Sequence, residues 1–288
     1  MQHFNVNYYF LFPDMSKLKL LVVTQELEPY TELSEIASLV SRLPQYAQDK
    51  GGFELRVLMP RYSSINERRH RLHEVVRLSG MNIIIDDDDY PLVIKVASMP
   101  NSRMQVYFLE NEDYFKRKNL FADDNGIPFE DNYERMIFFG KGVLEIVKKF
   151  GWSPDIIHCH GWMTGMLPLF VKNAYSHEPI FKNSKVVYSV YNSTPDMPLA
   201  DNFAQKAAIN GMDADLLKSY MQDGKLSIDA GAVSYSDGVI MGSEHYGPSV
   251  SGMLNETDKP LLDFQSEESF LPAYIEFYNH MLADKSAD

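Results

Sequence analysis

Cysteine and positive charge are both scarce in this 288-residue chain. Cys159 is the single cysteine, which excludes an intramolecular disulfide and fits a cytoplasmic protein. The chain holds 27 lysine and arginine residues against 40 aspartate and glutamate residues, a formal net charge of -13 at pH 7. Phosphate backbones and anionic lipid surfaces repel so acidic a chain, so we expect neither nucleic acid nor a membrane among its partners.

Long apolar runs and targeting signals are also missing. No apolar run approaches the roughly 20 residues that span a bilayer. The N-terminus has neither a cationic segment nor a small-residue cleavage site, so it does not read as a signal peptide. Met1 and Met15 are both candidate starts, and we expect residues 1–14 to be an extension that packs outside the fold.

Patterns for metal, phosphate or covalent chemistry are absent as well. The sequence has no glycine-rich phosphate loop and no recognisable Ser-His-Asp or Cys-His signature. His158, Cys159 and His160 are consecutive, but side chains alternate along a strand, so the three cannot converge on one ion. The four aspartates at 86–89 favour a solvated hairpin turn over a cation site, because calcium loops need a defined spacing and a glycine. We therefore predict no metal and no cofactor.

What the sequence does contain is a strong alternation of strands and helices. Hydrophobic residues make up 45% of the chain, enough for a substantial core. Short apolar segments predict buried strands around Leu20, Val57, Ile157, Val187 and Val239. Helical spacing predicts helices between or after them, at 32–49, 132–150, 163–173 and 267–283. The alternation predicts an α/β fold with a Rossmann-like, doubly wound, mostly parallel sheet.

Two regions depart from that alternation. Residues 72–109 hold several short β segments with no helix between them, which predicts a small β-rich insertion. The last predicted helix carries an aromatic face of Phe270, Tyr274, Phe277 and Met281, which we expect to dock on the domain or on a partner. The predicted organisation is an extension at 1–14, the Rossmann-like domain at 15–255 and a tail with a docking helix at 256–288.

Ligands of such folds bind beyond the carboxyl ends of the strands. The connections that begin there are 24–35, 160–162, 191–193 and 242–244. His160, at a strand end, is equally consistent with a ligand contact and with a packed core histidine. Trp162 could stack on a sugar, although core packing is the commoner role. Four glutamates crowd the first connection, and carboxylates there oppose phosphate binding.

Several ordered motifs run through the first 250 residues. The first motif is Pro29–Val40 followed by Leu43-Pro44. It is similar to a segment that follows a strand and reads Lys-x-Gly-Gly-Leu-Ala-Asp-Val-Val and then Leu-Pro. Residues 114–117 resemble a Tyr-Phe-x-Arg segment, and residues 131–135 resemble an Asp-Asn-x-Glu-Arg segment. Residues 151–162 resemble a Trp-x-Pro-Asp-hydrophobic-His-x-His-Asp-Trp segment. Together they resemble the N-terminal half of bacterial glycogen and plant starch synthases.

The resemblance implies the N-terminal domain of a GT-B glycosyltransferase. In that family two Rossmann-like domains close over ADP-glucose and a glucan chain end, and α-1,4-linked glucose is added with retention. The resemblance implies that His160 lines the glucose site and that Asn192 lies at the cleft edge, with Tyr191 and Trp162 as further substrate-binding candidates. It also implies a glucan or a glycogen-metabolism enzyme as partner, and ADP-glucose as a ligand.

Departures from the family pattern concentrate at the donor loop. The family lysine that meets the donor phosphate falls on Glu32, and its two glycines fall on Ser34 and Glu35. Glutamate turns attraction for a diphosphate into repulsion, and the added side chains keep the backbone away from a ligand. Gly161 stands where the family has an aspartate, and Tyr191 where it has a histidine. The family's C-terminal nucleotide-binding domain would also need roughly 100 more residues than the chain offers.

These observations predict a glycogen- or starch-synthase-like domain that is inactive alone and acts as a glucan-binding or regulatory module. The alternative is the catalytic half of a split glycogen synthase, whose partner chain brings the nucleotide-binding domain. A third interpretation is a structural subunit that docks on another glycogen enzyme. Whether the chain is an enzyme stays open, and His160 is its candidate catalytic residue.

Overall fold

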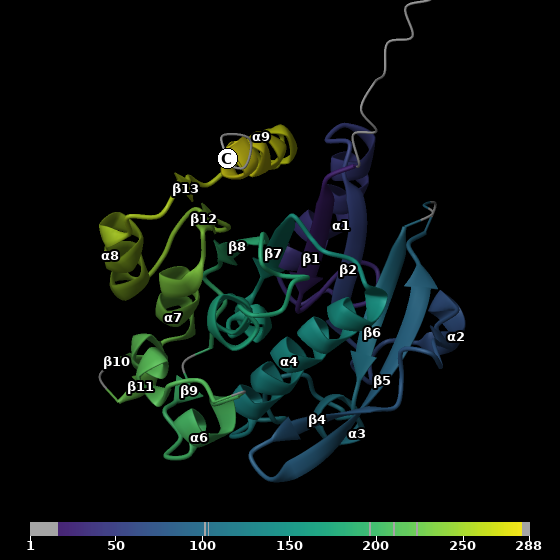
Figure 1. Ribbon diagram of the computed structural model, residues 1–288, viewed down its shortest axis with the longest axis vertical. Helices are drawn as coiled ribbons and strands as arrows, with labels where there is room; N and C mark the ends of the chain where they lie inside the picture. Colours follow the sequence, from purple (N-terminus) through teal and green to yellow (C-terminus); the bar gives the residue numbers. More distant parts are fainter. Residues whose placement is uncertain are drawn as a thin grey trace, which may run out of the picture.

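The computed structural model describes residues 17–283 except 101, 103, 196, 210 and 223, so the predicted extension at 1–14 lies outside the described residues. The strands of the main sheet are β1 (Lys19–Thr24), β2 (Glu54–Pro60), β3 (His73–Glu74), β4 (Met81–Ile85), β5 (Asp88–Ser98), β6 (Gln105–Glu110), β7 (Ile156–His160), β8 (Lys185–Val190), β12 (Gly238–Met241) and β13 (Leu261–Leu262). Within the described residues they form one ten-stranded sheet in the order β13-β12-β8-β7-β1-β2-β6-β5-β3, with β4 paired to β5 (Figure 1).

The five predicted strands lie side by side and parallel, which confirms the predicted α/β fold. Val22 of β1 is in register with Val57 of β2 and with His158 of β7, and β8 and β12 continue the sheet on the β7 side. Every side chain of β7 is buried, as expected for a strand covered on both faces. The carboxyl ends of these strands therefore meet at one edge.

The β-rich insertion is the antiparallel part of the same sheet. β5 pairs antiparallel with β6 and with β3, and β4 and β5 form a hairpin. The hairpin turns at Asp86, whose φ of 57 lies in the left-handed region, next to the exposed Asp87. Asp86 and Asp87 thus form a hairpin turn, as the sequence predicts, and Asp88 and Asp89 begin β5. The hairpin lies far along the sheet from β8 and β12.

The helices are α1 (Glu35–Asp49), α2 (Glu67–His70), α3 (Glu112–Phe115), α4 (Asn132–Phe150), α5 (Leu167–Leu169), α6 (Phe203–Ala207), α7 (Ile228–Tyr235), α8 (Pro248–Glu256) and α9 (Phe270–Ala283). α4 has the predicted bounds. The helix predicted at 163–173 is instead a 3-10 turn η1 (Trp162–Thr164), α5 and a π-helical turn η2 (Phe170–Ala174). Pro168 in α5 has no N–H to donate, so a regular helix cannot run through this segment.

A small second sheet was not predicted. It consists of β9 (Met197–Pro198), β10 (Met221–Gln222) and β11 (Lys225–Leu226), beside the 3-10 helix η3 (Ala214–Tyr220). Two-residue strands carry no period, so the sequence holds no signal for them. None of the helices in the described part of the chain is both long and apolar enough to cross a bilayer.

The tail completes the main sheet and covers it. β13 pairs parallel with β12, and α9 packs next to α1 (Figure 1, yellow beside purple). The predicted aromatic face is buried, since Phe270, Tyr274, Phe277 and Met281 are all at most 8% exposed. Tyr278 of the same helix contacts Nδ1 of His158 through its hydroxyl at 2.6 Å. The helix therefore docks on this domain, which is one of the two outcomes that the sequence predicted.

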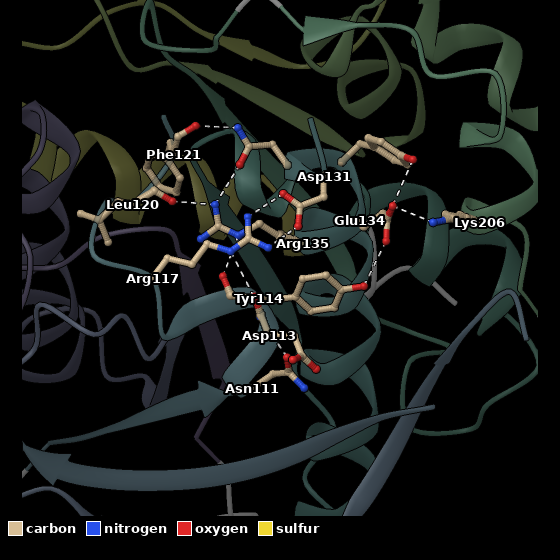
Figure 2. Close-up of polar contacts among 12 residues, drawn as sticks. Asn111, Asp113, Tyr114, Arg117, Leu120, Phe121, Asp131, Glu134, Arg135 and Lys206 are labelled. Atoms are coloured by element: carbon tan, nitrogen blue, oxygen red, sulfur yellow. Dashed lines mark hydrogen bonds and ion pairs between the residues drawn. The ribbon is translucent and has the colours of Figure 1, made fainter. Parts of the chain in front are cut away.

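Arg135, at the start of α4, holds the loop that joins α3 to α4 (Figure 2). Its guanidinium is fully buried and donates to the carbonyl oxygens of Tyr114 (2.8 Å) and Leu120 (2.6 Å) and to the side chain of Asn132 (2.8 Å). Burial lowers the pKa of Arg135 to about 10, so it stays charged at neutral pH. Arg117 pairs with Asp131 beside it. Two of the motifs behind the family resemblance thus meet as a structural clamp.

We expect Arg135→Lys to lower the free energy of unfolding by about 2–4 kcal/mol, because an ammonium cannot reach the three acceptors that the planar guanidinium reaches. Urea denaturation measures the loss. Arg117→Lys is the matched control, since Arg117 is part-exposed and its ion pair is screened by water, and it should cost about 1 kcal/mol or less. Equal losses in the two variants would contradict the structural role assigned to Arg135.

Candidate functional site

Three of the predicted strand-end connections are tied together by hydrogen bonds at the carboxyl edge of the sheet. Ser243, after β12, donates from its hydroxyl to the carboxylate of Glu35 in the first turn of α1 (2.6 Å). The same hydroxyl accepts from the backbone N–H of Asn192, after β8 (3.0 Å). Asn192 is exposed at this junction. The structure therefore brings Glu35, Asn192 and Ser243 to one place.

A cavity of about 490 Å³ opens at this junction, and we call it the strand-end cavity. Its wall combines the first half of α1, the connections after β8 and β12, and the segment that leads into α9. Arg42 stands in this wall, with its guanidinium 3.7 Å from the Glu267 carboxylate and 5.0 Å from the centre of the Phe270 ring. The exposed ring of Phe264 also lines the cavity.

The strand-end cavity carries an excess of negative charge. Among the described residues, Glu35, Glu244 and Glu267 line it. Its basic groups are the Arg42 guanidinium, which is already paired with Glu267, and the imidazole of His245. Nearby carboxylates repel a phosphate, and the paired guanidinium offers little compensation. Hydroxyl, amide and aromatic groups suit a neutral, hydroxyl-rich ligand better.

The loop before α1 is held by a buried carboxylate. Glu26 is fully buried and accepts hydrogen bonds from the backbone N–H groups of Leu33 (2.7 Å) and Ser34 (2.8 Å) and from the Ser34 hydroxyl (2.7 Å). Ser34 in turn caps α1, which explains why the helix begins at Glu35 and not at Glu32. The N–H groups of Leu33 and Ser34, just before the helix start, therefore already have a carboxylate partner inside the protein.

His160 lies beneath the strand-end surface and has no exposed area. Its Nδ1 is 2.8 Å from the Tyr191 hydroxyl, while its Nε2 has no hydrogen-bond partner among the described residues. Burial lowers the pKa of His160 to about 3, so its imidazole is neutral at physiological pH. Trp162 is buried as well and packs edge-on against Phe121, 4.9 Å between ring centres. Of the four predicted substrate-binding residues, only Asn192 is exposed.

His158 and His160 share one face of β7, as the strand alternation predicts, with ring centres 3.8 Å apart. His158 contacts the hydroxyls of Tyr278 (2.6 Å) and Ser189 (2.8 Å), so it is a packed core histidine. Cys159 points to the other face, and burial raises the pKa of its thiol. Among residues 17–283 with their five gaps, no three His, Cys, Asp or Glu side chains are grouped as metal ligands.

The backbone conformation and the space around position 161 explain why it is a glycine in this chain. Its φ of 82 lies in the left-handed region, and a Cβ there would come within 2.4 Å of the Gln25 side chain. The Gln25 amide fills this space and donates to Glu26 (3.2 Å). An aspartate at position 161, as in the family motif, would collide with that amide. Gly161 therefore leaves the space that Gln25 fills, and Gln25 in turn supports Glu26 through its hydrogen bond.

The structure brings several of the predicted site residues to one edge of the sheet, and it adds residues there that the sequence did not single out. The sequence singled out Glu32, Ser34 and Glu35, and the structure places Glu35 in the cavity wall, Ser34 at the helix cap and Glu32 exposed on the loop. It missed Arg42 and Phe264, because both residues come from segments read only as helix or tail. Their roles depend on the docking of α9, which no local pattern shows.

The buried pair of histidines, His158 and His160, predicts that the folded chain loses stability as the pH falls. Burial keeps both imidazoles neutral in the folded chain, lowering the pKa of His160 to about 3 and that of His158 well below its usual value. The unfolded chain takes up both protons below about pH 6.5, so the stability present above that pH is lost as the pH falls. Burial raises the pKa of Asp229 to about 6, which partly offsets the loss. We expect the free energy of unfolding to fall by about 2–3 kcal/mol between pH 7.5 and 5.0.

His160→Gln should keep a polar contact to Tyr191 without titrating, and it should shrink that pH-dependent loss by about 2 kcal/mol. Urea denaturation at both pH values measures it. The control is His177→Gln, because His177 is exposed. The interpretation is wrong if the two variants and the wild type lose the same stability.

Comparison with known proteins identifies the family. Residues 19–252 match the family model described as the starch synthase catalytic domain. Glycogen synthase of Chlorobaculum tepidum is 38% identical over 230 residues, 79% of this chain and 46% of that protein. Glycogen synthase of Chlorobium limicola is 45% identical over 175 residues, 60% of this chain and 36% of that protein.

A solved structure has the same fold. The catalytic domain of starch synthase IV from Arabidopsis thaliana superposes with a TM-score of 0.73 at 18% identity, over 87% of this chain and 52% of that one. The chain thus spans about half, or less, of the length of the relatives that it matches. Because the family model covers most of the sequence, the chain belongs to the starch synthase catalytic-domain family.

Proposed function

We propose that this chain is a starch-synthase-like module that binds an α-1,4-glucan and does not transfer glucose from ADP-glucose by itself. The observation that carries the proposal is the internal occupation of the donor loop by Glu26, which takes the N–H groups of Leu33 and Ser34. Transition-state charge on a leaving diphosphate needs fixed cations or free N–H donors nearby. This loop offers carboxylates instead.

The charge of the remaining loop residues supports the same conclusion. Glu32 is exposed where the family resemblance places a phosphate-binding lysine, and Glu35 lines the strand-end cavity. Each of these carboxylates would repel a diphosphate that came near it, which adds to the lack of free N–H donors. A neutral glucan carries no charge and is not repelled.

The glucan half of the proposal depends on the strand-end cavity. Asn192 supplies an exposed amide, and Phe264 an exposed aromatic face. Amides and carboxylates form hydrogen bonds with sugar hydroxyls, and an aromatic ring packs against the apolar face of a sugar. The Arabidopsis starch synthase IV domain was solved bound to ADP and acarbose. We assign the carbohydrate side of such binding to the present chain and not the nucleotide side.

In this proposal the buried candidate residues His160, Trp162 and Tyr191 hold neighbouring segments in place. The Tyr191 hydroxyl contacts His160, and the Tyr191 ring lies so close to Gly242 that a Cβ there would be 2.4 Å away. Trp162 packs on the loop clamped by Arg135. Tyr191 and His160 therefore support the connections that carry Asn192 and Ser243, and Trp162 supports the loop between α3 and α4. Glucan contact falls to Asn192.

The test has two readouts on protein free of host synthase. We expect no incorporation of radiolabelled glucose from ADP-glucose into glycogen, and co-sedimentation of the chain with glycogen. Asn192→Ala should weaken the co-sedimentation by about tenfold, the effect of losing one hydrogen bond to a buried ligand. Turnover by the chain alone contradicts the proposal. Turnover only after a partner chain is added would select the split synthase instead.

Glu32→Lys tests the electrostatic argument separately. It should tighten ADP binding by about three- to tenfold, because it exchanges repulsion for attraction at one point, and it should not restore turnover. Calorimetric titration with ADP measures the change. Glu74→Lys, on the exposed edge strand β3, changes the net charge equally and is the matched control. Equal tightening in both variants would show a general charge effect and overturn the assignment to the loop.

A further inference from the structure

A separate cavity of about 450 Å³ opens at the antiparallel end of the sheet, and we call it the β4 cavity. One wall is β4, from Asn82 to Ile84. Lys141 and Glu145 of α4 form a second wall, and the end of α6 closes much of the rest. β4, α4 and α6 lie together at this end of the molecule (Figure 1). The β4 cavity shares no lining residue with the strand-end cavity, so the two are separate sites.

Lys141 brings into the β4 cavity a charge that the described residues do not neutralise. It is 7% exposed, and its ammonium donates to the carbonyl oxygen of Ile84 (2.6 Å). No carboxylate of the described residues pairs with it. Burial lowers the pKa of Lys141 to about 8, so most of the ammonium is charged at neutral pH. Because an ammonium has three N–H donors and a buried charge is unfavourable without a partner, Lys141 has room for a carboxylate.

The edge of β4 adds backbone donors to the same wall. Pro91, opposite Asn82 on β5, turns its carbonyl oxygen to the side chain of Asn111 (2.9 Å) and so away from β4. In such an antiparallel pair, Asn82 and Ile84 also turn their N–H groups away from the partner strand. Among the described residues neither N–H group has a hydrogen-bond partner, and nor has the Asn82 side chain. These donors lie at the edge that Lys141 reaches.

Two carboxylates also line the β4 cavity. Glu145 lies one turn after Lys141, so both side chains project from one face of α4. The two do not pair with each other, since Lys141 turns to β4 while Glu145 accepts from the Tyr175 hydroxyl (2.8 Å) and pairs with a lysine of the next turn. Asp86 accepts from the side-chain amide of Gln205 (2.9 Å). The wall therefore presents a positive group and negative groups at separate points.

We propose that the β4 cavity binds a free α-amino acid with an apolar side chain. The Lys141 ammonium and the N–H groups of β4 hold its carboxylate, while Glu145 and Asp86 attract its ammonium. Its side chain lies against the apolar part of the wall, which consists of Ile83, Ile84, Ala208 and Ile209. A volume of about 450 Å³ is in the range of small-molecule sites. The inference is independent of glucan binding.

Other ligand classes fit the charges of this wall less well. A phosphate or a simple carboxylic acid meets Lys141 but is repelled by Glu145 and Asp86. A simple amine or a metal cation is repelled by Lys141. A neutral sugar leaves the Lys141 ammonium without a counter-charge. An amino acid carries both charges on one carbon atom, so it can meet both kinds of group at once.

Calorimetric titration of the full chain with L-leucine tests the site, and we expect saturable binding of one molecule. Lys141→Gln should weaken it at least tenfold, because glutamine keeps a donor for Ile84 but loses the charge-assisted hydrogen bond to the ligand carboxylate. Lys149→Gln is the matched control. Lys149 lies on the same helix and contacts the carbonyl oxygens of Leu78 and Ser79 (3.5 Å), but outside the cavity, so this variant should bind leucine like the wild type.

Analogues of leucine test the two charges on the unaltered protein. Isocaproate lacks the ammonium of leucine, and isoamylamine lacks its carboxylate, so each should bind at least tenfold more weakly. Glu145→Gln should weaken leucine binding severalfold without weakening isocaproate, because the carboxylate that attracts one ligand repels the other. In NMR spectra leucine should shift the amide signals of Asn82 and Ile84 and leave that of Asn192 in place.

The outcomes separate this site from the proposed glucan binding. Leucine binding that shifts Asn82 and Ile84 and weakens only in the Lys141 variant supports the site. Isocaproate binding as tightly as leucine would overturn the amino-acid assignment. No leucine binding by the wild type, or equal weakening in Lys141→Gln and Lys149→Gln, would overturn the site. Displacement of leucine by maltose would also overturn it, whereas binding of both together leaves both sites in place.

Discussion

The buried carboxylate of Glu26 forms the contacts on which the carboxyl edge of the sheet depends. Placing a charge inside the protein is unfavourable unless several donors meet it, and here two backbone N–H groups, the Ser34 hydroxyl and the Gln25 amide do so. The positive end of α1 adds to this stabilisation. The result is a fixed helix start that brings Glu35 to Ser243. The shape and the charge of the strand-end cavity follow from that geometry.

Substitutions around this carboxylate fit together physically. Gly161 leaves room for Gln25, and Gln25 donates to Glu26. In this set of contacts the loop before α1 packs against a carboxylate inside the protein. A loop that merely decays would more often lose its partners and leave buried polar atoms unpaired. The described structure leaves few such atoms, one of them Nε2 of His160.

The sequence predicted the sheet well because its signal is local. An apolar strand such as Ile156–His160 reads as buried on both faces wherever it lies, and the alternation of strands and helices then fixes a parallel order. The site was predicted less well, because exposure is decided by distant segments. His160 ends a strand, yet Tyr191 and the aromatic face of α9 enclose its surroundings. Asp229 sits in the first turn of a short helix with no local pattern to mark it.

Asn192 lies where two cavities of the described structure meet. It follows β8, the strand between β7 and β12, so its connection is the only one that borders both α7 and the Ser243 loop within the described cavities. On one side stand the carboxylates of the strand-end cavity, and on the other the single buried carboxylate of Asp229. Of the described residues that line the two cavities, Arg42 is the one lysine or arginine, and it is paired with Glu267. The glucan of the proposed function, which is uncharged and rich in hydroxyl groups, would meet no charge repulsion on either side.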